Sequence, residues 1–157
     1  IVLSRKRASE GLFPAIDPLQ SSSKMITPGI VGEHHYAIAQ AIRRTLAQYA
    51  ELKDIIAMLG LEQLSPDDRK VVARARRLER FLTQPFFTTE QFTNMKGKLV
   101  SLEDALDGCE RILADEFKDL PESALYMIGA VDEAFIKAKT KSERRVVKED
   151  ADAGDVT

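Results

Sequence analysis

The stretch IAQAIRRTLAQYAELKDIIAMLG, residues 38–60, decides the fold class of this chain. Its apolar residues recur at steps of three and four, at Ile38, Ile42, Leu46, Tyr49, Leu52, Ile56 and Leu59. Because an α-helix turns once every 3.6 residues, these side chains share one face of a single helix. Gly60 stands where such a helix would take its C-terminal cap. The pattern predicts one long amphipathic helix from about Gly32, and with it a mainly α-helical fold.

A second long helix is predicted a few residues later. Ser65 suits the N-cap position, Pro66 suits the first helical position, and Asp67 and Asp68 favour the positive end of the helix dipole. We expect Pro85 to stop this helix. Its expected buried face consists of Val71, Ala75, Leu78 and Leu82.

Shorter helical segments are predicted around Phe92 and from Ser101, Pro121 and Val131. Asp104 follows Ser101 at three residues, which is the spacing of a capping box. The expected buried face of the helix from Ser101 consists of Leu102, Leu106, Cys109 and Leu113. No internal repeat is visible, so these segments predict a small helical bundle.

The two ends of the chain differ from this helical middle. Turn-forming residues are spread through residues 1–31, with apolar anchors between them, which indicates an ordered connector. Ile1–Arg5 reads as a short strand without a second strand pattern nearby, so we expect a piece of a longer chain. We therefore divide the chain into a connector (1–31), a helical domain (32–140) and a charged tail (141–157) that we expect to be disordered.

Composition excludes several function classes. Of 157 residues, 44% are hydrophobic and 31% are charged, which is enough to bury a core. No apolar run approaches the roughly 20 residues of a membrane helix, so direct membrane insertion is not expected. The net charge of −2 predicts no general attraction to nucleic acid. One cysteine excludes an internal disulfide, and no CxxC or HExxH spacing indicates a metal site.

Three local features have both a structural and a functional interpretation. His34 and His35 are neighbours that diverge by about 100° on a helix, which favours a solvated or capping pair over a metal site. Cys109 has the spacing of a core position, so burial is favoured over reactivity. A basic run favours a solvated helix face, paired with acids or neighbouring subunits, and consists of Arg69, Lys70, Arg74, Arg76, Arg77 and Arg80.

Four of the seven phenylalanines fall within twelve residues, at Phe81, Phe86, Phe87 and Phe92. Core packing is the usual reason for such a cluster, and a flat slot for a planar ring is the functional alternative. No GxxxxGK[ST] loop accompanies it, so this chain carries no catalytic residues for phosphate chemistry by itself.

Six strings, in order over about residues 1–138, carry a family resemblance. They are VLSR (Val2–Arg5), PAIDPL (Pro14–Leu19), IVGEHHY (Ile30–Tyr36), DIIAMLG (Asp54–Gly60), VARARRLERFLTQPF (Val72–Phe86) and LPESALYMIG (Leu120–Gly129). With these the chain resembles the C-terminal portion of the catalytic beta subunits of F-type rotary ATP synthases. That resemblance implies a helical bundle preceded by a short strand and connector left over from an upstream α/β nucleotide-binding domain.

The resemblance also implies a base-binding role for the aromatic residues. In the family an aromatic residue before the Pro-Ala-(Val/Ile)-Asp-Pro string stacks on adenine, and Phe13 occupies that position here, where Tyr is common. Phe86 and Phe92 match the other aromatic walls of the pocket. Thr89 falls where the family often has Ala.

For the segment between the two long helices, the resemblance implies contact with a central rotor. The family usually reads DELSEED there, whereas this chain reads EQLSPDD, with fewer acids and a proline in place of a glutamate. A capped helix start can transmit force sterically, so the lever role is expected here and a role for dense negative charge is not. The expected contact residues are Met58, Leu59, Glu62, Gln63, Leu64, Ser65, Pro66, Asp67 and Asp68.

The remaining implications concern the intact subunit. ATP or ADP with Mg would bind there through phosphate and magnesium ligands upstream of Ile1, and we expect this chain alone neither to hydrolyse ATP nor to bind it tightly. The implied partners are alpha subunits and the rotor gamma subunit in a hetero-oligomer. The implied place is the cytoplasmic face of an energy-transducing membrane, or the matrix or stroma in an organelle. The competing hypothesis is a stand-alone helical interaction module without catalytic activity.

Overall fold

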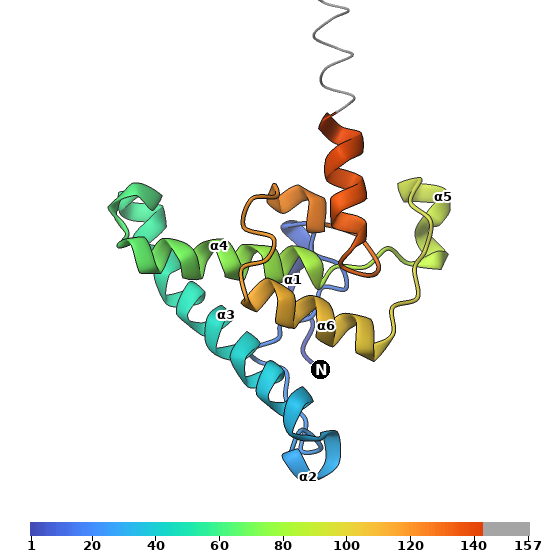
Figure 1. The fold of residues 1–157 in the computed structure, drawn as a ribbon, viewed down its shortest axis with the longest axis horizontal. Helices are drawn as coiled ribbons and strands as arrows, with labels where there is room; N and C mark the ends of the chain where they lie inside the picture. Colours follow the sequence, from blue (N-terminus) through green and yellow to red (C-terminus); the bar gives the residue numbers. More distant parts are fainter. Residues whose placement is uncertain (143–157) are drawn as a thin grey trace, which may run out of the picture.

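The computed structural model describes residues 1–142 and is mainly α-helical, as the sequence predicts (Figure 1). The elements are α1 (Arg5–Ser9), α2 (Pro28–Val31), α3 (Glu33–Leu59), η1 (Leu61–Gln63), α4 (Pro66–Phe81), η2 (Phe87–Thr89), α5 (Glu90–Thr93), α6 (Leu102–Leu113) and η3 (Glu122–Leu125). A final helix covers residues 133–142. None of the helices in this part of the chain is both long and apolar enough to cross a bilayer.

Helices α3 and α4 form an antiparallel hairpin, and the predicted caps are confirmed. The Oγ atom of Ser65 accepts a hydrogen bond from the backbone N–H of Asp68 at 3.1 Å, and Pro66 is the first residue of α4. At the end of α3, Gly60 has φ 84° and its N–H donates to the carbonyl of Ile56. That left-handed conformation favours glycine because a Cβ atom would crowd the backbone.

The core consists of two clusters that lie along α4. The first cluster joins α4 to α6 and the C-terminal segments, and its largest fully buried side chains are Leu78, Ile112, Phe117, Leu125 and Val131. The second joins α4 to α3 and contains Leu46, Tyr49, Leu64, Val72 and Ala75. The partly buried Ile42 packs against both clusters, so α3 links them.

The predicted buried face of α4 is wrong at both ends. Val72 and Phe81 are buried, whereas Val71 is only half-buried and Leu82 is exposed. At the C-terminal end the cause is Gly108 of α6, over which the ring of Phe81 lies: a Cβ atom at Gly108 would be 2.2 Å from Cζ of Phe81. At the N-terminal end Val72 packs in the second core cluster.

The predicted buried face of α6 also needs correction. Leu102 is exposed, and Leu106 and Leu113 are only half-buried. Cys109 is buried as predicted, Gly108 and Ile112 complete the buried face, and Leu106 and Leu113 pack against the first core cluster.

The expected strand at Ile1–Arg5 is also wrong. Leu3 and Ile16 make a single antiparallel bridge, and the pairing ends there because the N–H of Val2 donates to the Ser21 hydroxyl and the carbonyl of Ser4 accepts from the N–H of Ala8. The chain instead enters α1, whose N-cap is Ser4.

The hairpin end between α3 and α4 and the segment carrying α5 lie at opposite ends of the molecule (Figure 1). Helix α6 crosses the middle, and the chain from residue 133 rises away from the core. The predicted disorder of residues 141–157 concerns a segment that, from residue 143, lies outside the described residues.

Candidate functional site

The hairpin end between α3 and α4, called the tip below, spans residues 58–68. Leu64 anchors it, because this side chain is only 5% exposed and packs in the second core cluster. Ser65 caps α4, and its hydroxyl also donates to the carboxylate of Asp68 at 2.7 Å. Of the residues predicted to contact a partner, Leu64 thus points into the core and positions the others.

Arg69 fixes the backbone of the tip. Its Nε atom donates to the carbonyl of Leu64 at 3.0 Å, and its Nη2 atom donates to the carbonyl of Glu62 at 3.3 Å. These hydrogen bonds join the first turn of α4 to η1. The sequence predicted a solvated side chain for Arg69. Its contacts with backbone carbonyls could not be predicted, because they depend on the conformation of the turn before α4.

The outer surface of the tip combines apolar and acidic side chains. Met58 is 75% exposed and Leu59 is 65% exposed, although the periodicity of α3 assigned Leu59 to its buried face. Glu62 and Gln63 are exposed beside them, and Asp67 is exposed with Lys70 at 3.2 Å. The tip therefore offers a firm surface with apolar contacts and few acids.

The aromatic residues lie on the other side of the molecule. Phe13 comes next to the segment after α4, because the N–H of Gln84 donates to the carbonyl of Phe13 at 2.8 Å. Tyr126 holds the same connector by donating its hydroxyl to the carbonyl of Gly11 at 2.8 Å. The structure thus brings Phe13 and Phe86 to neighbouring segments, and both side chains are half-exposed.

Phe86, Thr89 and Phe92 belong to one projecting loop, residues 84–98, which carries η2 and α5. Its two ends are joined, because Lys98 donates its N–H to the carbonyl of Pro85 at 3.2 Å and accepts a hydrogen bond from the Gln84 side chain.

Within the loop, Glu90 accepts a hydrogen bond from the N–H of Gly97 at 2.7 Å. A Cβ atom at Gly97 would lie 2.5 Å from the backbone nitrogen of Phe87, so only glycine allows this close approach. The loop is therefore held by its own contacts.

The loop presents its aromatic rings outward. Phe92 is 86% exposed, the largest exposure among the predicted base-contacting residues. The hydroxyl of Thr89 donates to the carbonyl of Phe86 at 3.2 Å, so it caps the turn instead of pointing freely outward. Core packing, the structural interpretation of the phenylalanine cluster, holds for Phe81 but not for Phe86, Phe87 or Phe92.

Most of the basic run on α4 contacts the chain itself. Arg74 pairs with Asp115, and this hydrogen bond raises the pKa of its guanidinium group. Arg77 donates to the backbone carbonyls of Phe117, Lys118 and Leu120, and Arg76 donates to the Tyr49 hydroxyl at 3.3 Å. The expected pairing with an acid is confirmed for Arg74. The expectation is wrong for Arg76 and Arg77, which bind a tyrosine hydroxyl and backbone carbonyls of the segments that cross α4.

A charged joint connects α1 to the hairpin and was missed from the sequence. Arg7 pairs with Glu79 of α4 at 3.0 Å, and their side chains are only 16% and 10% exposed. Lys53 of α3 lies 3.7 Å from the same carboxylate. The irregular composition of residues 1–31 gave no reason to expect a helix there, so it gave no partner for Glu79.

His34 and Cys109 follow their structural interpretations. His34 is exposed and pairs with Glu110 of α6 at 3.0 Å. Cys109 is buried, and this burial raises the pKa of its thiol to about 12. Within residues 1–142, no group of three His, Cys, Asp or Glu side chains is placed to hold a metal ion.

Curated relatives match nearly the whole chain. It is 90% identical over 134 residues to the "ATP synthase subunit beta 2" of Polaromonas naphthalenivorans and 79% identical over 154 residues to the "ATP synthase subunit beta 1" of Marinomonas sp.. These alignments cover 85% and 98% of this chain, but only 28% and 32% of the relatives. The chain thus spans less than a third of the length of these relatives.

A match to a family model agrees with the match to these relatives. The model described as the C-terminal domain of V and A type ATP synthase matches residues 24–126, which is more than half of the chain. This range contains α2–α6 and the whole tip. The chain therefore belongs to the family of ATP synthase C-terminal domains.

Proposed function

We propose that this chain is the C-terminal part of the catalytic beta subunit of an F-type, proton-translocating rotary ATP synthase. Such a subunit makes ATP from ADP and phosphate when the rotor turns, or hydrolyses ATP in the reverse direction. The observation that carries the proposal is the 90% identity over 134 residues to a protein named as a beta subunit. The intact subunit would act in a hetero-oligomer with alpha subunits and a gamma rotor, peripheral to an energy-transducing membrane on its cytoplasmic, matrix or stromal side.

In this proposal the aromatic side of the molecule contacts the nucleotide base. Phe13 and the 84–98 loop come from neighbouring segments, and their rings are available to solvent. A planar base can stack on such rings without a dedicated set of hydrogen bonds. Mg and the phosphates of ATP or ADP would be held by residues outside this chain. The role of this side is therefore binding and orientation of the base.

The tip acts as the lever that meets the rotor. Leu64 anchors it in the core, the Ser65 cap starts α4, and Arg69 fixes the backbone between them. A surface supported in this way resists displacement, so a push from the rotor would move α3 and α4 together. The exposed side chains of Met58 and Leu59 provide the contact area, and the few acids of the tip are not required for it.

Nucleotide binding by the intact subunit tests the base-contact proposal. Phe13→Ala and Phe92→Ala should each weaken ATP binding by about 1–3 kcal/mol, or about 5- to 150-fold, because base stacking on the ring is lost. Leu99→Ala is the matched control, since Leu99 is an exposed apolar residue near the same loop. Equal ATP affinity of all three variants and the wild type would contradict base stacking and leave these rings a structural role only.

Torque measurement on the assembled complex tests the lever. Replacing Glu62, Asp67 and Asp68 by their amides should leave the torque unchanged, because the contact is steric. Met58→Ala combined with Leu59→Ala should reduce it, since the contact surface recedes. A torque that falls with the acids and persists in the apolar double variant would contradict this proposal.

A further inference from the structure

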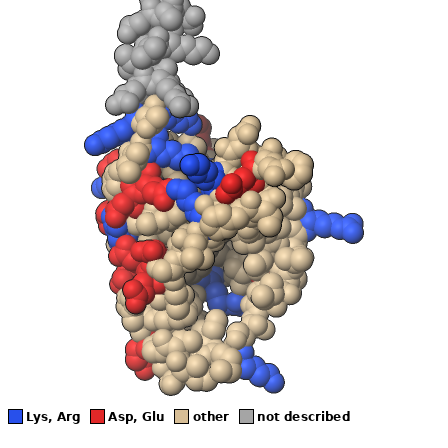
Figure 2. All heavy atoms as spheres, turned by 90° about the vertical axis from the view of Figure 1, so that its right-hand side faces the viewer, with Lys and Arg blue, Asp and Glu red and all other residues tan. Residues whose placement is uncertain are grey.

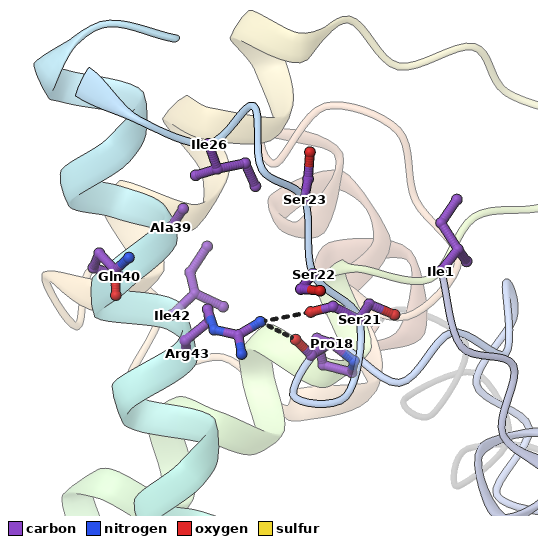
Figure 3. A pocket seen from close by; sticks show the side chains of 10 residues that line it. All are labelled: Ile1, Pro18, Ser21, Ser22, Ser23, Ile26, Ala39, Gln40, Ile42 and Arg43. Atoms are coloured by element: carbon purple, nitrogen blue, oxygen red, sulfur yellow. Dashed lines mark hydrogen bonds between the residues drawn. The ribbon is translucent and has the colours of Figure 1, made fainter. Parts of the chain in front are cut away.

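A pocket between the N-terminal connector and α3 belongs neither to the tip nor to the aromatic loop. Its volume is about 480 Å³, which is within the usual range for small-molecule sites. Apolar residues of its lining are Ile1, Pro18, Ile26, Ala39 and Ile42, and polar ones are Gln40, Arg43 and the Ser21–Ser23 run (Figure 3). The molecule is visibly hollowed on the face seen in Figure 2, where Lys or Arg atoms lie at the floor of the hollow.

Arg43 is held in a fixed position at this pocket. Its Nη1 atom donates to the carbonyls of Pro18 at 2.7 Å and Ser21 at 2.9 Å (Figure 3). Its Nη2 atom donates to the carbonyl of Leu19 at 3.0 Å. A guanidinium group has five N–H donors, so Nε–H and one Nη2–H remain without a partner among residues 1–142.

The charge of Arg43 is also uncompensated. Its three acceptors are neutral carbonyls, which satisfy donors but carry no negative charge. No carboxylate of the described residues lies within 4.0 Å of its guanidinium nitrogens, in contrast to Arg7, Arg74 and Arg111, each of which has an acid partner. A half-buried cation beside an apolar wall favours an anion, because the interaction is poorly screened there.

We propose that this pocket binds an organic carboxylate with an apolar body, such as a medium-chain fatty acid. The carboxylate would accept hydrogen bonds from the free N–H groups of Arg43, whose fixed orientation suits a carboxylate. The apolar body would lie along Ile26, Ala39 and Ile42. Charge complementarity and the apolar wall together select an amphipathic anion over a neutral lipid or a bare phosphate.

Titration of the 157-residue chain with decanoate, followed by amide chemical shifts, tests this site. Saturable shifts should appear at the connector and at α3 around Ala39. 1-Decanol should bind at least about 10-fold more weakly, because it lacks the charge that pairs with Arg43. Arg43→Gln should weaken decanoate binding by a similar factor. Arg44→Gln is the matched control, since it removes one charge at the exposed neighbouring position.

A second variant keeps the test valid if Arg43→Gln loosens the connector. Ala39→Leu fills the apolar wall without removing any contact of Arg43, and it should abolish binding. Three results would overturn the proposal: no saturable shifts at the pocket, equal binding of decanoate and decanol, or an equal loss in Arg43→Gln and Arg44→Gln.

The same titration on a full-length beta subunit tests whether the pocket is open to a ligand there or is filled by other parts of the subunit. Decanoate should shift the same resonances of the connector and α3 in that protein. Absence of binding in the full-length subunit would also overturn the proposal, because it would mean that other parts of the subunit fill the pocket. None of these outcomes depends on nucleotide binding or on the rotor, so the site can fail while the proposed function stands.

Discussion

Cys109 links the packing of α6 to a measurable pH dependence. Burial raises the pKa of its thiol from an ordinary value near 9 to about 12, so the folded chain keeps it protonated where the unfolded chain does not. The resulting stabilisation is complete below pH 9 and is lost as the pH rises toward 12. Between pH 9.5 and 11, the free energy of unfolding should fall by about 1.4 kcal/mol per pH unit more steeply in wild type than in Cys109→Ala. Urea titrations at a series of pH values measure both slopes, and parallel slopes would contradict the prediction.

Glu79 is the shared acid of the ion pairs that join α1 to the hairpin. Glu79→Gln removes the anion that Arg7 and Lys53 share, and it leaves Arg7 as a largely buried cation without its partner. We expect a loss of about 3 kcal/mol in the free energy of unfolding, because breaking a buried pair strands the remaining charge. Asp67→Asn is the control: its pair with Lys70 is exposed and should contribute less than about 1 kcal/mol. Urea unfolding measures the loss in the free energy of unfolding for both variants. Similar losses would mean that burial does not strengthen the ion pairs of Glu79.

The limits of sequence reasoning at this scale are visible in the arginines of α4. Helical spacing correctly assigned Ala75 and Leu78 to the core, because periodicity reports which face is apolar. It could not assign Arg77, since the carbonyls that this side chain binds belong to residues 117–120, about forty positions away. The same holds for Leu64 at the tip, whose burial follows from the turn and not from either helix.

At the scale of elements, Gly108 sets the distance between α4 and α6. A Cβ atom there would lie 2.2 Å from Cζ and 2.5 Å from Cε1 of Phe81, so the helices or the ring must move. Gly108→Ala should therefore lower the free energy of unfolding by about 1–3 kcal/mol, despite the better helix propensity of Ala. Gly29→Ala is a matched control in α2, where a Cβ atom meets nothing within 4 Å. Thermal unfolding should separate the two variants, and a neutral Gly108→Ala would show that this crossing is loosely packed.

Helix boundaries were predictable where local chemistry decides them. Ser65, Pro66 and Ser101 mark helix starts through caps that involve only neighbouring residues, and all three are confirmed. The failed strand at Ile1–Arg5 shows the opposite case, because a strand needs a partner that spacing within the segment cannot supply. For the candidate site, sequence indicated which residues to examine, but their base and rotor contacts remain predictions.

At the scale of the whole molecule, the tip could transmit a push to the aromatic side only if the two core clusters behave as one cooperative unit. The tip rests on the second core cluster, whereas Cys109 lies in the first. Ile42 packs against both, and α4 contributes Val72 and Ala75 to one and Leu78 and Phe81 to the other. Truncating a side chain in the second cluster should consequently destabilise the first cluster as well.

Leu46→Ala tests this coupling, because Leu46 is buried in the second cluster only. The variant should lose about 2–5 kcal/mol in the free energy of unfolding measured by circular dichroism. If unfolding is cooperative, the free energy of opening reported by thiol labelling of Cys109 should fall by the same amount, although Cys109 belongs to the other cluster. Leu59→Ala at the exposed end of α3 should change neither quantity by more than about 0.5 kcal/mol. Unchanged protection of Cys109 in Leu46→Ala would mean that the clusters open independently, and a push at the tip would then be absorbed within the hairpin before it reached the aromatic side.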